Sequence, residues 1–240
     1  MKTLAIDTSA LVATAAICED ETPKAIYSLK TGLTHSRTML PLIKHLLEDT
    51  ETAIDDIDLF AVSSGPGSFT GVRIGVSCIK GLAFGKHKPC VGVSTLEAMA
   101  LSLAPLGTDT LLCPVMDARR GQVYHAIFES HGGTARRLTP DGLGNAEALV
   151  AEVEAMHRPV LYFGDGAPIV ASLDPPAALP VPAHCHWQNA YGVALAALRR
   201  YREAPDPSVF TDELLRPSYL RPSQAEREAD EKENATSILS

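Results

Sequence analysis

Short apolar runs and amphipathic segments alternate along the first half of the chain. The apolar runs are bounded by polar turns and predict strands at residues 3–6, 11–18, 24–29, 59–63 and 91–93. Helical periodicity predicts three helices, at residues 36–49, 70–84 and 95–103. In the first helix the apolar residues recur at i, i+1, i+4, i+7 and i+8, namely Met39, Leu40, Ile43, Leu46 and Leu47.

The second half of the chain repeats the beginning of the first. A strand ending in Asp117, a short turn and a second strand echo the unit that ends its first strand in Asp7, and the two aspartates lie 117 − 7 = 110 residues apart. Further elements are predicted as strands at 111–116, 123–128 and 160–163 and helices at 145–156 and 190–201. The pattern predicts a mixed α/β fold of two related lobes. We expect residues 1–108 and 109–220 to form the lobes and residues 221–240 to be a mobile tail.

Composition narrows the class of protein. The 240 residues are 45% hydrophobic, enough for a substantial core, and carry 21 Lys and Arg against 29 Asp and Glu. A net charge of −8 argues against a free-standing nucleic-acid binder. The five cysteines are widely spaced without a CxxC motif, and charges interrupt the apolar segments early, so we expect a cytoplasmic protein without a signal peptide or membrane span.

The predicted helix at residues 70–84 has two apolar stripes, whereas a surface helix needs one. One stripe contains Val72, Val76, Ile79 and Ala83, and the other contains Ile74, Cys78 and Leu82. Either the helix is buried inside its own lobe, or one stripe docks on another protein. Gly71 and Gly75, four residues apart, would let a partner helix come close.

A glycine-rich loop precedes this helix. Residues 63–75 run from a strand through Gly65, Gly67 and Ser68 into the helix, a geometry that can hold an anion at the helix N-terminus. The alternative is structural: the glycines form a tight turn, and Ser68 or Thr70 caps the helix. Possible phosphate contacts lie here and at the two strand ends, namely Asp7, Thr8, Ser9, Gly65, Gly67, Ser68 and Asp117.

Histidine and cysteine patterns give little support for a metal site or a nucleophile. His184 and His186 alternate around Cys185, but no carboxylate lies nearby to complete a metal site. The cysteines lack a neighbouring catalytic motif. We therefore predict no metal and no catalytic residue.

One segment resembles a known family closely. Residues 65–75, GPGSFTGVRIG, are similar to the signature of the TsaB (YeaZ) family. Weaker matches follow in the family's order, at residues 4–9, 35–36, 40–43, 117–120, 123–124 and 164–166. The resemblance is dense over residues 1–128 and thinner to about residue 220.

The resemblance implies a two-lobed fold of the actin/hexokinase/Hsp70 ATPase type, with mixed sheets flanked by helices. It also implies a scaffold and activator that partners TsaD and TsaE, which add threonylcarbamoyl to the adenosine beside the anticodon of tRNAs reading codons that begin with A. We expect a homodimer when the chain is alone, ATP or ADP at the subunit junction, no cofactor of its own, and only indirect contact with tRNA. The expected partner interface comprises Met39, Ile43, Leu46, Gly71, Val72, Gly75, Val76 and Ile79.

Departures from the catalytic relative TsaD favour a non-catalytic role. TsaD binds its metal through two histidines four residues apart on a helix, and this chain has no HxxxH motif. Ser9 stands where the wider ATPase superfamily has a glycine beside the phosphate. Two alternatives stay open: a nucleotide hydrolase that uses Asp7, Asp117 and the loop 65–71, and a peptidase that acts on TsaD.

Overall fold

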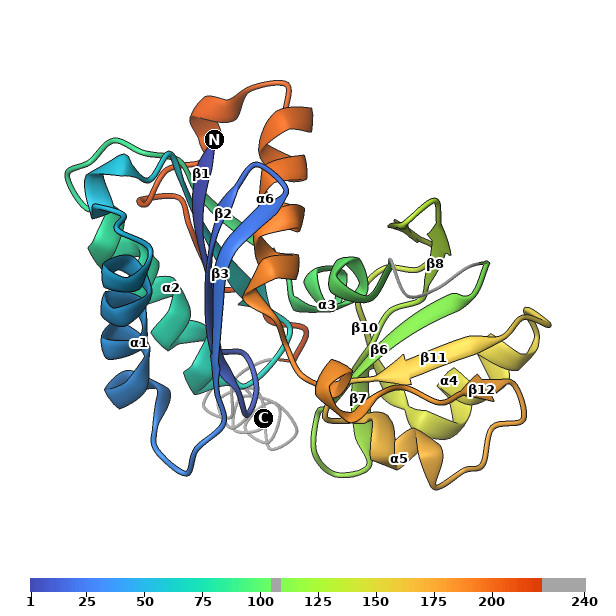
Figure 1. Cartoon of the computed structure of the whole chain (residues 1–240). Coiled ribbons are helices and arrows are strands. Elements are labelled where there is room, and N and C mark those ends of the chain that lie inside the picture. Colours follow the sequence, from blue (N-terminus) through green and yellow to red (C-terminus); the bar gives the residue numbers. More distant parts are fainter. Residues whose placement is uncertain (105–108, 222–240) are drawn as a thin grey trace, which may run out of the picture.

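The computed structural model describes residues 1–104 and 109–221, which form two lobes (Figure 1). In the first sheet the strand order is β3-β2-β1-β4-β5. Strand β2 runs antiparallel to β1, and β4 runs parallel to it. The elements are β1 (Lys2–Asp7), β2 (Ala13–Glu19), β3 (Thr22–Leu29), α1 (His35–Asp49), β4 (Leu59–Gly65), α2 (Phe69–Ala83), β5 (Cys90–Ser94) and α3 (Thr95–Leu103).

The second sheet repeats this plan, with the strand order β10-β7-β6-β11-β12. Here β7 runs antiparallel to β6, and β11 runs parallel to it. The duplication and the mixed α/β class predicted from the sequence are therefore confirmed. The elements are β6 (Leu111–Asp117), β7 (Gln122–His125), β8 (Phe128–His131), β9 (Thr134–Arg137), β10 (Gly142–Asn145), α4 (Ala146–Glu154), β11 (Val160–Phe163), α5 (Ala167–Ala171), β12 (Ala178–Leu179) and α6 (Ala190–Glu203).

The single strand predicted at residues 123–128 is two strands in the structure. Strand β7 pairs with the second half of β6, from Val115 onward, whereas β8 pairs with its first two residues. Pro114 lies between the two paired stretches and has no N–H to donate, so the antiparallel ladder is interrupted there. Strand β8 then turns into β9, a hairpin that the sequence pattern did not reveal.

Helix α6 follows the second lobe in the sequence but packs on the first lobe. It packs against β1, β2, β4 and β5 on the face of the first sheet opposite α1 and α2 (Figure 1). It also crosses α3 closely, because Gly192 has no side chain: a Cβ there would lie 1.9 Å from the carbonyl oxygen of Ala98. The expected second lobe of residues 109–220 is therefore wrong for its last part. The expected boundary at residue 108, and the tail apart from Arg221, lie outside the described residues.

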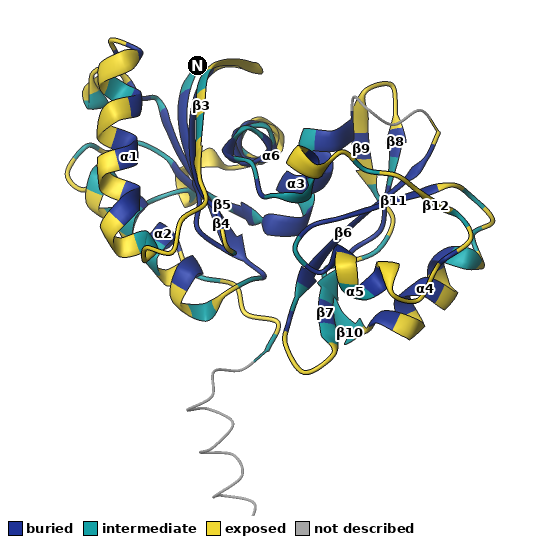
Figure 2. Ribbon diagram, turned by 60° about the horizontal axis from the view of Figure 1, so that its bottom comes forward, coloured by how far each residue is buried: buried dark blue, intermediate teal, exposed yellow. Residues whose placement is uncertain are grey.

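The expected partner interface is buried within this chain, so its predicted exposure is wrong. Helices α1 and α2 turn their buried side toward the first sheet and leave the other side exposed (Figure 2). Of the expected set, the six apolar side chains are at most 4% exposed and pack with strand residues such as Leu4, Ile6 and Phe60. The set comprises Met39, Ile43, Leu46, Val72, Val76, Ile79 and the buried glycines Gly71 and Gly75.

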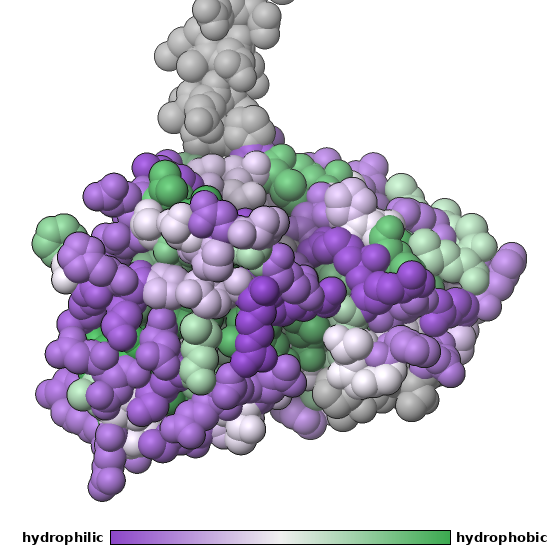
Figure 3. All heavy atoms as spheres, turned by 90° about the horizontal axis from the view of Figure 1, so that it is seen from above, coloured by the Kyte–Doolittle hydropathy of each residue, from purple (hydrophilic) through white to green (hydrophobic). Residues whose placement is uncertain are grey.

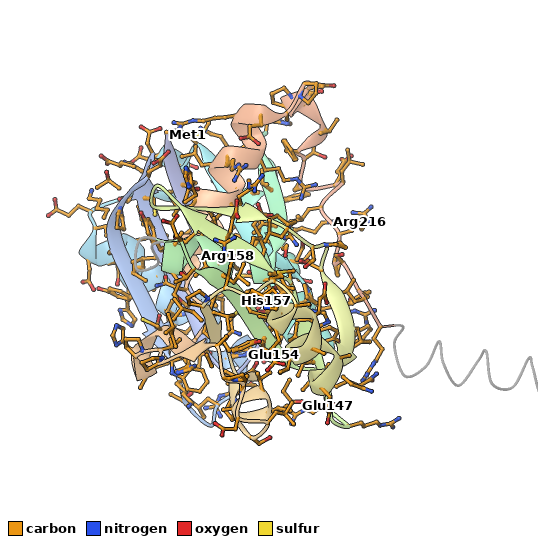
Figure 4. All side chains as sticks on the ribbon, turned by 90° about the vertical axis from the view of Figure 1, so that its right-hand side faces the viewer. Met1, Glu147, Glu154, His157, Arg158 and Arg216 are labelled. Carbon is orange, nitrogen blue, oxygen red and sulfur yellow. The ribbon has the colours of Figure 1, made fainter. Side chains whose placement is uncertain are left out.

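The face of the molecule seen from above is largely polar. Seen from above, hydrophilic residues cover most of the surface (Figure 3). The side-chain view of the second lobe shows Glu147 and Glu154 along α4 and Arg158 beyond its end (Figure 4). Arg158 pairs with Glu129 at 2.8 Å between Nη1 and Oε2. This polar surface differs from the groove beside α1 and α2, whose lining includes several apolar side chains.

Candidate functional site

Equivalent turns follow the first strand of each lobe. Asp7 ends β1, and its Oδ1 accepts a hydrogen bond from the N–H of Ser9 at 2.7 Å. Asp117 ends β6, and its Oδ1 accepts from the N–H of Arg119, also at 2.7 Å. Each aspartate thus forms a turn with the residue two positions on. The sequence correspondence of the two aspartates reflects a shared local structure.

Asp7 is held inside the protein. It is 1% exposed, and its two carboxylate oxygens accept from the hydroxyl of Ser9 at 2.6 Å and that of Ser63 at 2.5 Å. Burial raises the pKa of Asp7, and the hydrogen bonds from Ser63 and Ser9 partly offset that rise. Its hydrogen-bonding capacity is used within the turn and β4, so Asp7 fixes the turn.

The glycine-rich loop closes against this turn. Gly67 has φ +156°, and a Cβ there would lie 2.5 Å from the carbonyl oxygen of Ser9. That same oxygen accepts the N–H of Ser68 at 2.7 Å. Ser68 caps α2 by accepting the N–H of Gly71 at 3.3 Å, as the structural interpretation of the loop predicted.

The glycines of α2 do not serve the approach of a partner helix. A Cβ on Gly71 would lie 2.1 Å from the carbonyl oxygen of Thr8, and one on Gly75 would lie 2.6 Å from Thr8 Oγ1. The Thr8 hydroxyl also donates to the carbonyl of Gly71 at 2.7 Å. Both glycines therefore make room for the end of β1, and the expected role of these two residues is wrong.

A cleft of about 680 Å³ lies between the two lobes. Asp117 is on its wall, and the N–H of Asp117 donates to Oδ1 of Asp165 at 3.2 Å. Burial, followed by the charge of Asp117, raises the pKa of Asp165. Of the predicted phosphate contacts, Ser9, Gly67, Ser68 and Asp117 line the cleft. Asp7, Thr8 and Gly65 do not line it.

Cations and aromatic rings also line this cleft. Three arginines contribute, namely Arg73, Arg119 and Arg221, together with the ring of Tyr219. Arg73, Tyr219 and Arg221 were not among the site residues predicted from the sequence. Arg73 lies inside the quoted loop motif, but no local pattern marks Tyr219 or Arg221, which reach the cleft only through the return of the chain to the first lobe.

A second hollow, of about 550 Å³, runs along the outer sides of α1 and α2; we call it the groove. Leu40 on α1 is 55% exposed there, and Ile74 and Cys78 on α2 are half-buried. Ile74 and Cys78 belong to the second apolar stripe predicted for this helix. Burial raises the pKa of Cys78 to about 11. The full lining is His35, Ser36, Met39, Leu40, Phe69, Thr70, Arg73, Ile74, Ser77 and Cys78.

The sequence predicted neither a metal site nor a membrane-spanning helix. Within residues 1–104 and 109–221, no three or more His, Cys, Asp or Glu side chains cluster as a metal ion would require. His184 and His186 belong to a 3₁₀ turn, Ala183–His186, in which Cys185 is buried. Over those same ranges, no helix combines the length and hydropathy of a bilayer-crossing segment.

Comparison with known proteins finds a matching family model and several relatives of this chain. The model of a family described as TsaD, tRNA N6-adenosine threonylcarbamoyltransferase, matches residues 29–229. The tRNA threonylcarbamoyladenosine biosynthesis protein TsaB of Bacillus subtilis (strain 168) is 36% identical over 164 residues, 68% of this chain and 71% of the relative. The protein of the same name from Escherichia coli (strain K12) is 39% identical over 129 residues, 54% of this chain and 55% of the relative.

Solved structures agree with the fold. An uncharacterised Pseudomonas aeruginosa protein, titled as similar to peptidase YeaZ, has a TM-score of 0.77 at 25% identity, covering 92% of this chain and 99% of that one. YeaZ from Pseudomonas aeruginosa gives 0.73 at 24% identity, with 91% and 99% covered. The Acidaminococcus fermentans (R)-2-hydroxyglutaryl-CoA dehydratase component A gives 0.50 at 12%, with 85% and 100% covered, a likeness of fold alone. The chain thus shares its fold with these structures, and the two-lobed fold with mixed sheets flanked by helices that the resemblance implied is confirmed.

Proposed function

Because the chain belongs to the TsaB (YeaZ) family of tRNA threonylcarbamoyladenosine biosynthesis proteins, we propose that it is a non-catalytic subunit that pairs with a TsaD protein. In the proposed complex, TsaD transfers the threonylcarbamoyl group to the adenosine beside the anticodon, and TsaE is a further partner. This chain supports TsaD in its active conformation and contacts tRNA only through the complex.

The groove along α1 and α2 is the observation that carries this proposal. Its walls combine the exposed Leu40 and the half-buried Ile74 with the small side chains of Ser77 and Cys78. Such a surface suits the packing of another helix pair. The TsaD family model matches this chain from residue 29, ahead of α1, through α2, so a TsaD protein would offer an equivalent pair. Two equivalent pairs can pack about a near-twofold axis, and a second copy of this chain would use the same surface.

The closed loops support a role without nucleotide hydrolysis. A phosphate placed between the first turn and the glycine-rich loop would displace the 2.7 Å hydrogen bond from Ser68 N to Ser9 O. It would also have to enter where a Cβ on Gly67 would already lie 2.5 Å from Ser9 O. The Asp7 carboxylate accepts from Ser9 and Ser63, and only a rearrangement of β1 and β4 would free it.

A binding experiment with one variant and one matched control tests the pairing. Leu40→Asp places a charge in the groove, and Leu214→Asp places the same charge on a leucine that is 61% exposed and does not line it. Leu40→Asp should weaken binding to the TsaD protein of the same organism about thirtyfold or more, as expected for a central interface residue. Size-exclusion chromatography with light scattering and calorimetry would measure it. Equal affinity of the two variants would refute the assigned surface.

Nucleotide binding in the cleft is a second candidate function. The observation that favours it is the lining of the cleft by Arg73, Arg119 and Arg221, cations that match phosphate groups. Calorimetry with ATP or ADP and magnesium, on the chain alone and mixed with TsaD, would separate a site within this chain from one at the subunit junction. Absence of heat in both titrations would remove this candidate.

A further inference from the structure

Residues 218–221, which follow α6 in the sequence, run from the first lobe to the second; we call this segment the strap. At its start the N–H of Ser218 donates to the carbonyl oxygen of Ser64 at 2.7 Å. The neighbouring Gly65 has φ +129°, and a Cβ there would lie 2.1 Å from the carbonyl oxygen of Ser218. The first lobe therefore has a glycine where the strap passes, and the strap is a fitted part of the structure.

The middle of the strap packs on α2. The ring of Tyr219 stacks on Phe69 with 4.7 Å between centroids, and its hydroxyl accepts from Nε of Arg73 at 2.8 Å. The guanidinium of Arg73 in turn lies 3.8 Å from the centre of the Phe69 ring. These three side chains form one stack at the N-terminal end of α2.

The end of the strap holds the second lobe. Arg221 donates from Nη1 to the carbonyl oxygen of Ala118 at 2.8 Å and from Nη2 to the side-chain oxygen of Gln122. Ala118 begins the turn between β6 and β7, directly after Asp117 at the end of β6, and Gln122 is the first residue of β7. The strap thus lines the cleft and joins α2 to the β6–β7 turn of the other lobe.

Two residues are common to the cleft and the groove. Phe69 and Arg73 line both hollows; Tyr219 stacks on Phe69 and accepts a hydrogen bond from Arg73. A second link runs beside them, because Nε2 of His35, on the groove, lies 2.6 Å from the carbonyl oxygen of Ala10 in the first turn of the cleft. A molecule seated in the groove would therefore contact side chains whose positions the strap fixes.

We propose that the strap couples the groove to the two lobes, so that partner binding and strap closure favour each other. This inference rests on the proposed function, since the occupant of the groove is the TsaD-type partner. With Tyr219 in place, Arg73 and Phe69 are already ordered on the groove wall, and the partner need not immobilise them. By linkage, a bound partner tightens the strap and its hold on the β6–β7 turn by the same factor.

Two strap variants and one control test the coupling. Arg221→Gln removes the hold on the second lobe, and Tyr219→Leu removes the stack; neither residue lines the groove. Arg216→Gln is the control, because Arg216 lies two residues before the strap (Figure 4) and, among the described residues, donates to the carbonyl oxygens of Glu213 and Leu215. Thermal unfolding of each variant first establishes that it is folded.

Calorimetry with TsaD and hydrogen exchange of the turn amides, Ala118 to Gln122, are the measurements. We expect Arg221→Gln and Tyr219→Leu to weaken TsaD binding roughly three- to tenfold, with the control unchanged. We also expect TsaD to slow exchange in the turn of the wild-type chain and not in Arg221→Gln. Equal or tighter binding by both strap variants, or turn exchange that does not respond to TsaD, overturns the coupling. No binding of TsaD to the wild-type chain overturns the proposed function instead. Turn exchange in the chain alone that is the same with and without Arg221 overturns the strap itself.

Discussion

Two positions on α2, only two residues apart, separate folding from binding. Val76 is 4% exposed and packs against the first sheet, whereas Ile74 is half-buried on the groove side. The same substitution, to aspartate, therefore tests two different surfaces of one helix. Val76→Asp should destabilise the chain, and Ile74→Asp should weaken partner binding in a chain that stays folded.

The magnitudes follow from burial. Removing the Val76 side chain from the core forfeits about 1.5–3 kcal/mol of transfer free energy. Placing an unpaired carboxylate there adds several kcal/mol. The sum is comparable with the whole stability of a typical protein, about 5–15 kcal/mol. Ile74→Asp, by contrast, changes a surface position and a helix propensity and should cost less than about 1 kcal/mol.

Urea unfolding followed by circular dichroism at fixed protein concentration measures the first effect, and calorimetry with TsaD measures the second. Fixed concentration matters because self-association would itself stabilise the chain. If Val76→Asp unfolds at the wild-type urea concentration and loses only TsaD binding, Val76 faces the partner and the burial argument is refuted. If Ile74→Asp binds TsaD normally, the groove is not the interface.

Three further substitutions or measurements follow from single sites. Gly71→Ala should destabilise the chain, because the new Cβ would lie 2.1 Å from Thr8 O, whereas Gly81→Ala in the same helix meets nothing within 4 Å and should add roughly 0.5–1 kcal/mol to the unfolding free energy. Because burial raises the pKa of Asp7, its ionised form opposes folding; the unfolding free energy of wild type relative to Asp7→Asn should therefore rise as the pH falls from neutral toward about 4, and a flat or opposite trend would contradict this. Cys78, with a pKa of about 11, should be alkylated roughly tenfold faster per pH unit between pH 7 and 10, and TsaD should protect it.

The local hydrophobic periodicity of the sequence was sufficient to predict most of the helices and strands. Helix α3 and strand β11 have the predicted limits, and α2 begins and ends within one residue of its prediction. These segments owe their structure to turn residues and apolar spacing that lie within the segment itself. Strand β8 was missed because pairing with β6 and β9, more than local pattern, defines it. Helix α5 was missed because its five residues are too few to show a helical period.

The orientation of α2 could not be predicted from its pattern. Both stripes are apolar, and only contact with the sheet decides which one is inside. The position of the glycines was the available signal: Gly71 and Gly75 lie on the side of Val72 and Val76, where Thr8 comes closest. The strap residues Tyr219 and Arg221 gave no signal at all, because they reach the cleft from the far end of the chain.

The duplicated lobes help to separate packing from chemistry in the glycine motifs. In the first lobe Gly67, just after β4, faces Ser9 at the end of β1; in the second, a Cβ on Gly166, just after β11, would lie 2.8 Å from Met116 C at the end of β6. Each glycine thus allows two parallel strand ends to meet closely, whether or not a ligand lies beside them. The aspartates differ, since Asp7 is sealed from the cleft while Asp117 lines it and pairs with Arg119 at 3.5 Å. A motif present in both lobes is therefore explained by strand packing. The features that distinguish the first lobe, namely the groove and the contact of the strap with α2, are where partner binding should be tested.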